Sequence, residues 1–267
     1  MTTYAFDNAW RQARERLALL ERCLDPATTR RMLALGVGAG WRCLEVGAGG
    51  GSIAQWLCAR VGAGGRVVAT DIDTRFLDAL TAPNLEVRRH DVASDPLPPA
   101  TFDLVHSRMV LMHLPDREQL LGRLVAALTP GGWLLLEEQD LFPITALGAG
   151  VYAATWAAFH RAAQAFGSRG DWARGLPALL AARGDLADVA GEGDLPFFAG
   201  GAPMAEFWRL TWEQLRAGIV QAGAGEEEVA EAQRQLADPA QQFVGPAIVA
   251  AWGRRRAGER MATANNR

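Results

Sequence analysis

The most informative segment of this 267-residue chain is Leu44-Glu45-Val46-Gly47-Ala48-Gly49-Gly50-Gly51-Ser52. An apolar segment that carries a carboxylate is followed by glycine at every second position. Glycine tolerates positive φ and leaves room for a ligand, and a following helix directs its free N–H groups back at the loop. The pattern predicts a strand, a nucleotide-binding loop and a helix, and its alternative is a flexible glycine turn.

The sequence after this loop alternates between strand and helix patterns. Strands are predicted at 42–46, 66–70, 85–90, 102–106 and 133–137, and helices at 52–60, 74–80 and 117–128. Short connections between alternating elements predict a parallel sheet with right-handed crossovers and helices on both faces. Ligands of such sheets bind at the carboxyl ends of the strands.

The flanking segments complete a predicted single domain over residues 1–267. Residues 1–40 are expected to form a helical cap, with helices at 8–24 and 26–35, and residues 41–140 the cofactor-binding core. Residues 141–215 are expected to form a helical insertion after the fifth strand, acting as a substrate lid. Residues 216–267 should add a helix at 226–236 and a strand at 243–252. We expect seven strands, most of them parallel.

The insertion and the residues after it are rich in aromatic side chains. These residues are Tyr152, Trp156, Phe159, Phe166, Trp172, Phe207, Trp208 and Trp212. Aromatic residues at helical spacing usually pack in a core, and the alternative is an apolar lid over a substrate pocket. The apolar run at 146–159 could also pack against a second subunit, as in a homodimer.

Composition excludes several classes of protein. A net charge of −3 and a pI near 5.9 argue against nucleic-acid binding. Cys23, Cys43 and Cys58 lack the spacing of metal ligands, so we expect reduced thiols, a cytoplasmic protein and no metal site. The sequence shows no signal-peptide pattern and no apolar run long enough to cross a membrane.

Polar residues follow each of the next three predicted strands. Asp71 closes the second strand, where a carboxylate can accept hydrogen bonds from both hydroxyls of a ribose. His90-Asp91-Val92 closes the third strand and Ser107 the fourth. Together with the glycine loop, these residues should lie on one rim of the sheet.

At this point residues 42–140 resemble the class I S-adenosylmethionine-dependent methyltransferases of the small-molecule branch, which have a Rossmann-like fold. The family's Glu-x-Gly-x-Gly-x-Gly loop matches Glu45, Gly47, Gly49 and Gly51, and Pro130-Gly131-Gly132 matches a turn before its fifth strand. The resemblance implies that the loop lies along the methionine part of the cofactor. It also implies that Asp71 holds the ribose and that Asp91 and Val92 contact the adenine.

The resemblance gives a full set of expected cofactor-binding residues. They are Glu45, Gly47, Ala48, Gly49, Gly51, Asp71, Ile72, Asp91, Val92 and Ser107. In similar enzymes N-terminal helices cover the cofactor, so Tyr4 or Trp10 could lie over the methyl site. We expect S-adenosylmethionine as cofactor, and methyl transfer to a small, apolar or aromatic metabolite as the reaction.

Two other reactions remain as alternatives. An enzyme of the same fold could bind the cofactor and catalyse a non-methylating reaction such as a cyclisation. An NAD-dependent oxidoreductase also needs a glycine loop and an acidic residue, but its Gly-x-Gly-x-x-Gly spacing places glycine where Ser52 stands. Nucleic-acid base methyltransferases usually carry an Asn or Asp before Pro-Pro and an aromatic residue after the fourth strand, where this chain has His106-Ser107-Arg108-Met109.

The predicted catalytic residue is His113, which follows the fourth strand. The sulfonium of the cofactor is already electrophilic, so a base is needed only where the acceptor loses a proton. Imidazole has a suitable pKa for that role, with a structural or pocket-lining histidine as the alternative. His106 is the second candidate, and Glu138, Asp140 and His160 could contact the acceptor or lie elsewhere.

Overall fold

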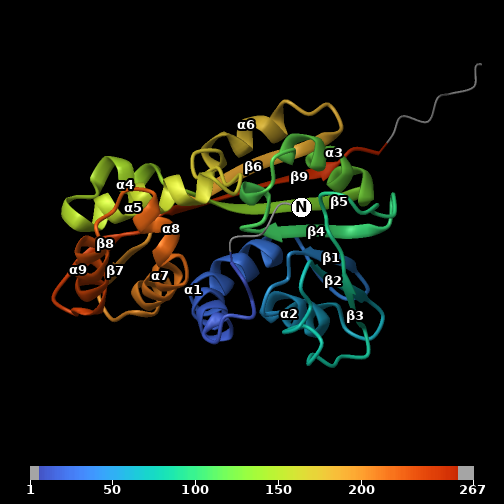
Figure 1. The fold of residues 1–267 in the computed structure, drawn as a ribbon. Helices are drawn as coiled ribbons and strands as arrows, with labels where there is room; N and C mark the ends of the chain where they lie inside the picture. Colours follow the sequence, from blue (N-terminus) through green and yellow to red (C-terminus); the bar gives the residue numbers. More distant parts are fainter. Residues whose placement is uncertain (1–5, 258–267) are drawn as a thin grey trace, which may run out of the picture.

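The computed structural model describes residues 6–257 and places seven strands in one sheet (Figure 1). The strands of this sheet are β1 (Arg42–Val46), β2 (Arg66–Asp71), β3 (Leu85–Arg89), β4 (Phe102–Arg108), β5 (Leu128–Asp140), β6 (Leu186–Asp194) and β9 (Ala247–Arg255). Their order is β3-β2-β1-β4-β5-β9-β6, and β9 runs antiparallel to both of its neighbours. The predicted α/β fold with a mostly parallel seven-stranded sheet is confirmed.

Helices cover both faces of the sheet, as predicted. On one face, α3 (Arg117–Ala127) and α6 (Leu176–Ala181) pack on apolar residues of β1, β4 and β5. On the other face, α2 (Ser52–Val61) and the end of α1 (Ala13–Ala34) cover Cys43, Leu104 and Leu135. Because both faces are covered, β1 is buried from Cys43 to Val46 and reads as a continuous apolar run except for Glu45.

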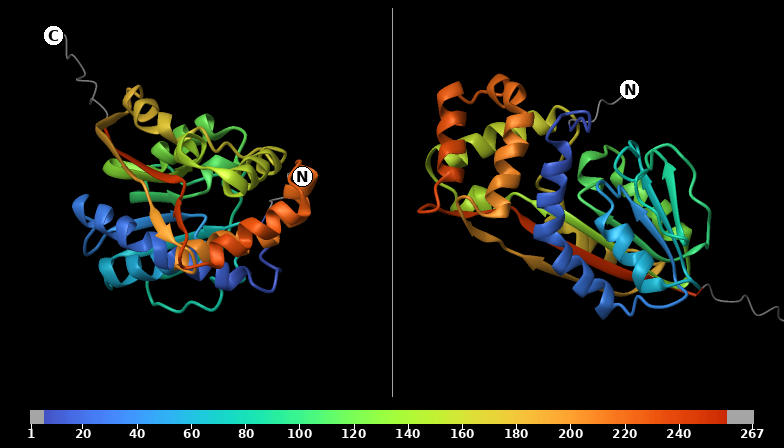
Figure 2. Two further views of the ribbon diagram at one scale, coloured as in Figure 1. Left: turned by 90° about the vertical axis from the view of Figure 1, so that its left-hand side faces the viewer. Right: turned by 90° about the horizontal axis from the view of Figure 1, so that it is seen from below.

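A second group of helices stands beside the end of the long strands β5 and β9 (Figures 1 and 2). This helical unit consists of α4 (Phe142–Leu147), α5 (Gly150–Gln164), α7 (Pro203–Gln214), α8 (Arg216–Gln221) and α9 (Glu226–Ala237). A small sheet of β7 (Phe197–Ala199) and β8 (Gln242–Val244) packs with it. Tyr152, Trp156 and Trp212 are buried in its core, so these aromatic residues pack within the chain.

The helix α1 joins the helical unit to the sheet (Figure 2). Leu19 and Leu20 pack against the core of the helical unit, whereas Met32 belongs to the core under the sheet. The prediction of two helices broken before Pro26 was wrong, because α1 continues through Pro26. A proline inside a helix removes one hydrogen bond. Here contacts of Thr28 and Arg31 with the sheet outweigh that loss.

Three further local predictions were wrong. The segment 74–80 forms turns rather than a helix, and the strand expected at 243–252 is divided into β8 and β9. Gly245 and Pro246 lie at this division, and proline cannot donate a hydrogen bond to a neighbouring strand. The turn expected at 129–132 lies inside β5, where Gly131 has a φ of +86°.

The segment 141–215, expected to be helical, also contains β6 and β7. Strand β6 becomes the edge of the large sheet because β9 returns between it and β5. The three cysteines are free thiols, as predicted. In the part of the chain that the structure describes, no helix is long and apolar enough to cross a membrane.

Candidate cofactor and acceptor site

The glycine loop lies between β1 and α2 and turns sharply through left-handed backbone. Gly47, Gly49 and Gly51 have φ of +69°, +55° and +87°, which L side chains rarely adopt. A Cβ on Gly47 would lie 2.2 Å from Val110 Cγ2, and one on Gly51 would lie 2.3 Å from Leu80 Cδ1. The spacing of the glycines therefore has two causes, the backbone turn and the close approach of neighbouring segments.

Asp71 at the end of β2 connects the loop to the next rim position. Its Oδ2 accepts a hydrogen bond from the Gly49 N–H at 2.9 Å, and its Oδ1 accepts one from the Asp73 N–H at 3.0 Å. Burial raises the pKa of this carboxyl above its usual value. Each oxygen keeps a second lone pair that can accept a hydrogen bond from a ligand hydroxyl.

The third rim position is the turn after β3. Asp91 accepts a hydrogen bond from the Ala93 N–H at 2.9 Å, and Val92 is buried. Glu45, Asp71 and Asp91 all line one cavity of about 530 Å³. This volume is within the range of ordinary ligand pockets.

The turn after β4 is fixed to β5 by a buried carboxylate. Glu138 accepts hydrogen bonds from the N–H groups of Val110, Leu111 and Met112 at 3.2, 2.9 and 3.2 Å. Burial raises the pKa of Glu138 to about 7. Just before these residues, Met109 has a φ of +57°, a strained conformation that often occurs at functional sites. Glu138 does not line the cavity, and it holds the segment that leads to His113.

His113 ends the short 3-10 helix η1 (Leu111–His113) and lines the cavity. Its ring lies edge-on to Phe6, with ring centroids 6.0 Å apart. Burial and the positive charges of Arg16 and Arg117 lower the pKa of His113 to about 4. The imidazole is therefore neutral at physiological pH.

His106, the second histidine candidate, lies in the interior of the sheet instead of facing a ligand. Its Nδ1 is 2.7 Å from Glu45 Oε2 and its Nε2 is 3.0 Å from Glu137 Oε2. Burial opposes the charged form, but the two carboxylates raise the pKa of His106 to about 9. The prediction of a catalytic role for His106 was wrong, because the side chain is fully buried and absent from the cavity wall.

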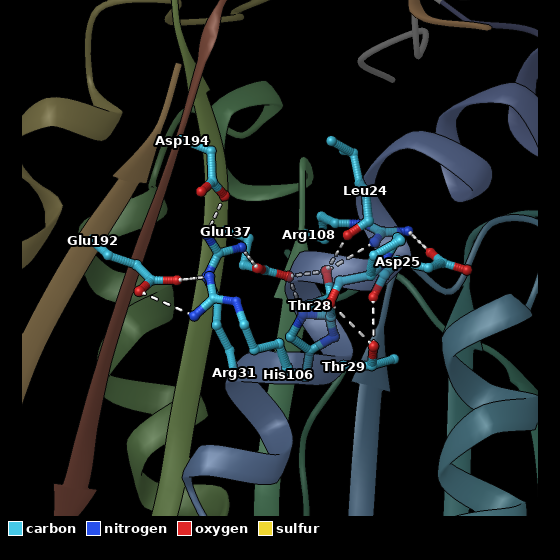
Figure 3. Close-up of polar contacts among 12 residues, drawn as sticks. Leu24, Asp25, Thr28, Thr29, Arg31, His106, Arg108, Glu137, Glu192 and Asp194 are labelled. Carbon is cyan, nitrogen blue, oxygen red and sulfur yellow. Dashed lines mark hydrogen bonds and ion pairs between the residues drawn. The ribbon is translucent and has the colours of Figure 1, made fainter. Parts of the chain in front are cut away.

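A network of charges extends from the buried His106 to partly exposed carboxylates at the edge of the sheet (Figure 3). Arg31 of α1 forms ion pairs with Glu137, Asp194 and Glu192, the last with Nε at 2.6 Å from Oε1. Thr28 donates a hydrogen bond to Glu137 at 2.6 Å. The network therefore ties α1 to β5 and β6, while Glu45 at its other end lines the cavity.

The cavity has two parts with different linings. The cofactor half, formed by the turns after β1, β2 and β3, is lined by Glu45, Gly47, Ala48, Gly49, Asp71, Ile72, Asp91 and Val92. The apolar half, formed by the N-terminal segment, α1, α5, α7 and the end of β5, is lined by Phe6, Arg16, Met112, Gln139, Leu141, Phe159, His160, Phe207 and Trp208. His113 lines the same cavity.

Two expected cofactor residues do not line the cavity. Ser107 is fully buried inside the sheet, and its contact with the cofactor stays a prediction. Gly51 directly precedes α2 in left-handed backbone, and its contact with the cofactor likewise stays a prediction. Asp140 is also absent from the cavity wall, because its carboxylate pairs with Arg174 at 2.7 Å.

Sequence reasoning missed Glu21 and Gln139, which both line the cavity. Glu21 of α1 lies over the glycine loop, so that a Cβ on Gly50 would be 2.0 Å from its Oε1. The sequence predicted a helical cap here but not which residues face the loop. Gln139 lies near the end of β5. The sequence signal that could have indicated it is its position two residues after the strand predicted at 133–137. Trp10 does not line the cavity, and Tyr4 lies outside the described residues.

Comparison with known proteins identifies the family. Residues 44–136, from β1 to β5, match the family described as a methyltransferase domain. With the sheet order and the glycine loop, this match identifies residues 44–136 as a methyltransferase domain of the class I S-adenosylmethionine-dependent type. The methyl donor of such domains is S-adenosylmethionine, and this match disfavours the NAD-dependent alternative.

Individual relatives match over parts of their length. The chain is 35% identical over 100 residues to methyltransferase str2 of Strobilurus tenacellus, which covers 37% of this chain and 36% of that protein. It is 49% identical over 45 residues to methyltransferase str3 of the same fungus, which covers 17% of this chain and 16% of that protein. The chain therefore spans about a third or less of these curated relatives.

Solved structures show the same fold over most of the chain. The YcgJ protein of Bacillus subtilis superimposes with a TM-score of 0.58 at 15% identity, covering 86% of this chain and 98% of that protein. Phosphoethanolamine N-methyltransferase 2 of Haemonchus contortus, solved with S-adenosyl-L-methionine, gives a TM-score of 0.52 at 18% identity. The superposition covers 92% of this chain and 52% of that protein.

Proposed function

We propose that this protein transfers a methyl group from S-adenosylmethionine to a small molecule with an apolar or aromatic body. The observation that carries the proposal is a single cavity with two chemically different halves. One half presents a glycine loop and carboxylates, and the other presents Phe159, Phe207 and Trp208. A polar nucleotide-like cofactor and an apolar acceptor would then meet in one cavity.

The residues of the cofactor half suit S-adenosylmethionine. Asp71 would accept hydrogen bonds from the ribose hydroxyls, the backbone from Gly47 to Gly49 would lie along the methionine part, and Asp91 and Val92 would contact the adenine. Glu21 would lie near the same loop and supply a negative charge. When bound, the cofactor supplies an electrophilic methyl group.

The chain's own residues would position the acceptor and exclude water from it. The aromatic side chains of the apolar half would hold the acceptor, and α1 with Phe6 would cover it. His113 is our proposed base for an acceptor that loses a proton. Its lowered pKa keeps the imidazole unprotonated at neutral pH, although it also makes the ring a weaker base than an ordinary histidine. The free thiols Cys23, Cys43 and Cys58 support a reducing, cytoplasmic setting.

Calorimetric titration tests the cofactor assignment. We expect S-adenosylhomocysteine to bind with a micromolar Kd, Asp71→Ala to weaken this binding at least tenfold, and NAD⁺ not to bind. Asp78→Ala is the matched control, because Asp78 is an exposed carboxylate of the same connection and does not line the cavity. Binding of NAD⁺ alone, or equal effects of the two substitutions, would contradict the proposal.

Product mass then tests the reaction itself. The protein is incubated with S-adenosylmethionine and a panel of hydroxylated aromatic compounds, and products are analysed by mass spectrometry. We expect a product heavier by one CH₂ together with S-adenosylhomocysteine. A product of unchanged mass would instead indicate a non-methylating reaction such as a cyclisation.

A further inference from the structure

The wall of the apolar half contains one buried amide whose hydrogen bonding is incomplete. Gln139 is 4% exposed, lies in β5 opposite Ile248 of β9, and lines the cavity. Within residues 6–257, its Oε1 is buried and no group donates a hydrogen bond to it. Most buried side-chain polar atoms in proteins do have such a partner, so this oxygen calls for an explanation.

The neighbours of Gln139 do not supply the missing donor. A small recess beside it is lined by Leu20, Met109, Phe207 and Trp208, which are apolar or aromatic. Glu138 before it and Asp140 after it are both engaged, by the backbone after β4 and by Arg174 respectively. The amide thus lies among apolar and aromatic side chains, as is typical of pockets that orient a ligand with a few polar contacts.

Trp208 provides a second, independent observation in the same wall. It is 3% exposed and lines both the main cavity and the recess beside Gln139. Its Nε1 is buried, and no residue between 6 and 257 accepts a hydrogen bond from it. A buried indole N–H usually finds a partner. The indole N–H groups of Trp156 and Trp212 in the adjacent core share this property, but of the three only Trp208 lines the cavity. The apolar half therefore presents an acceptor on Gln139 and a donor on Trp208.

We propose that Gln139 and Trp208 form the specificity site for the methyl acceptor, and that the acceptor is a neutral molecule with a hydroxyl group on an apolar ring system. A hydroxyl both donates and accepts, so it can serve Gln139 Oε1 as a donor and Trp208 Nε1 as an acceptor, and both residues line the same cavity and the same recess. A carboxylate has no proton to donate to Gln139. This inference rests on the proposed function, because it concerns the acceptor of the same reaction.

Binding in the presence of saturating S-adenosylhomocysteine tests this site with two probes, 2-naphthol and naphthalene. The probes share one ring system and differ by one hydroxyl. We expect wild type to bind 2-naphthol at least about tenfold more tightly than naphthalene, and Gln139→Leu to reduce this preference severalfold, because one net hydrogen bond contributes up to about this factor. Trp208→Phe should reduce the preference and keep the aromatic wall.

The control variant is Gln55→Leu, which makes the same change at an exposed position of α2 outside the cavity. It should keep the wild-type preference. The affinity of each variant for S-adenosylhomocysteine reports whether the protein is folded and whether the cofactor site is intact. Loss of that affinity in wild type would refute the proposed function. Normal cofactor binding with an unchanged preference in Gln139→Leu would refute the specificity site, and failure of both probes to bind would refute the ring-containing acceptor.

Discussion

The buried imidazole of His106 should contribute strongly and in a pH-dependent way to stability. Its two ring nitrogens contact Glu45 and Glu137 at 2.7 and 3.0 Å, and the side chain is fully buried. The perturbation we choose is His106→Gln. This variant keeps a polar side chain of similar size but cannot carry the positive charge that lies between the two carboxylates.

The expected magnitude follows from the pKa of His106. The carboxylates raise it from 6.5 to about 9 against the effect of burial. At about 1.4 kcal/mol for each pKa unit, this difference corresponds to about 3 kcal/mol at pH values below 6.5. Removing one partner of a buried ion pair typically costs about 3–5 kcal/mol, which agrees with this value.

The sign of the pH dependence is fixed by the raised pKa. The folded state holds the proton of His106 more tightly than the unfolded state, so this stabilisation is complete below pH 6.5. It is lost as the pH rises through about 9. The difference in unfolding free energy between wild type and His106→Gln should therefore shrink over this range.

Urea unfolding followed by tryptophan fluorescence and circular dichroism at a series of pH values measures this difference. Arg234→Ala is the control, because it removes an exposed arginine that pairs with Glu227 and Glu231 on α9. It should leave the unfolding midpoint unchanged. A cost below about 1 kcal/mol for His106→Gln at pH 6, or a difference that does not change between pH 6 and about 10, would refute the reasoning.

Three further predictions concern His113, Gly47 and Glu138. Histidine NMR titration should show His113 with a pKa near 4 and His106 with a pKa near 9. The variants His113→Asn and His106→Gln assign the two signals. A pKa near 6.5 for His113 would exclude its burial beside Arg16 and Arg117. Gly47→Ala should abolish S-adenosylhomocysteine binding in calorimetry, because the added Cβ would overlap Val110. The control is Gly40→Ala, at a glycine with a similar φ of +83° and open space around it. This variant should bind normally, and its free energy of unfolding should fall by only about 1–2 kcal/mol. Wild-type stability should fall as the pH rises from 4.5 through about 7, because burial makes Glu138 hold its proton in the folded state. The same urea series on Glu138→Gln should show a smaller decline, with the remainder due to other buried carboxyls such as Asp71.

The central sheet and the rim of the cofactor half were predictable from local sequence patterns. The alternation of strands and helices is a local pattern, and parallel strands with short crossovers leave few ways of assembly. Because the carboxyl ends of those strands meet at one edge, Glu45, Asp71 and Asp91 could be placed together from their positions alone, and they line one cavity. The glycine loop was predictable because its φ angles are a property of the residues themselves.

Which polar side chains line the cavity, and which are buried in pairs, depends on contacts between distant segments of the chain. His106 and Ser107 stand next to each other at the end of β4, yet both are buried within the sheet, whereas His113 and Gln139 line the cavity. The roles of Arg31, Glu137 and Glu192 depend on contacts between α1, β5 and β6, which are far apart in the sequence. The continuation of α1 through Pro26 and the return of β9 between β5 and β6 also depend on contacts between distant segments. Burial and pairing across distant segments determine these features, and local sequence patterns carry no information about such contacts.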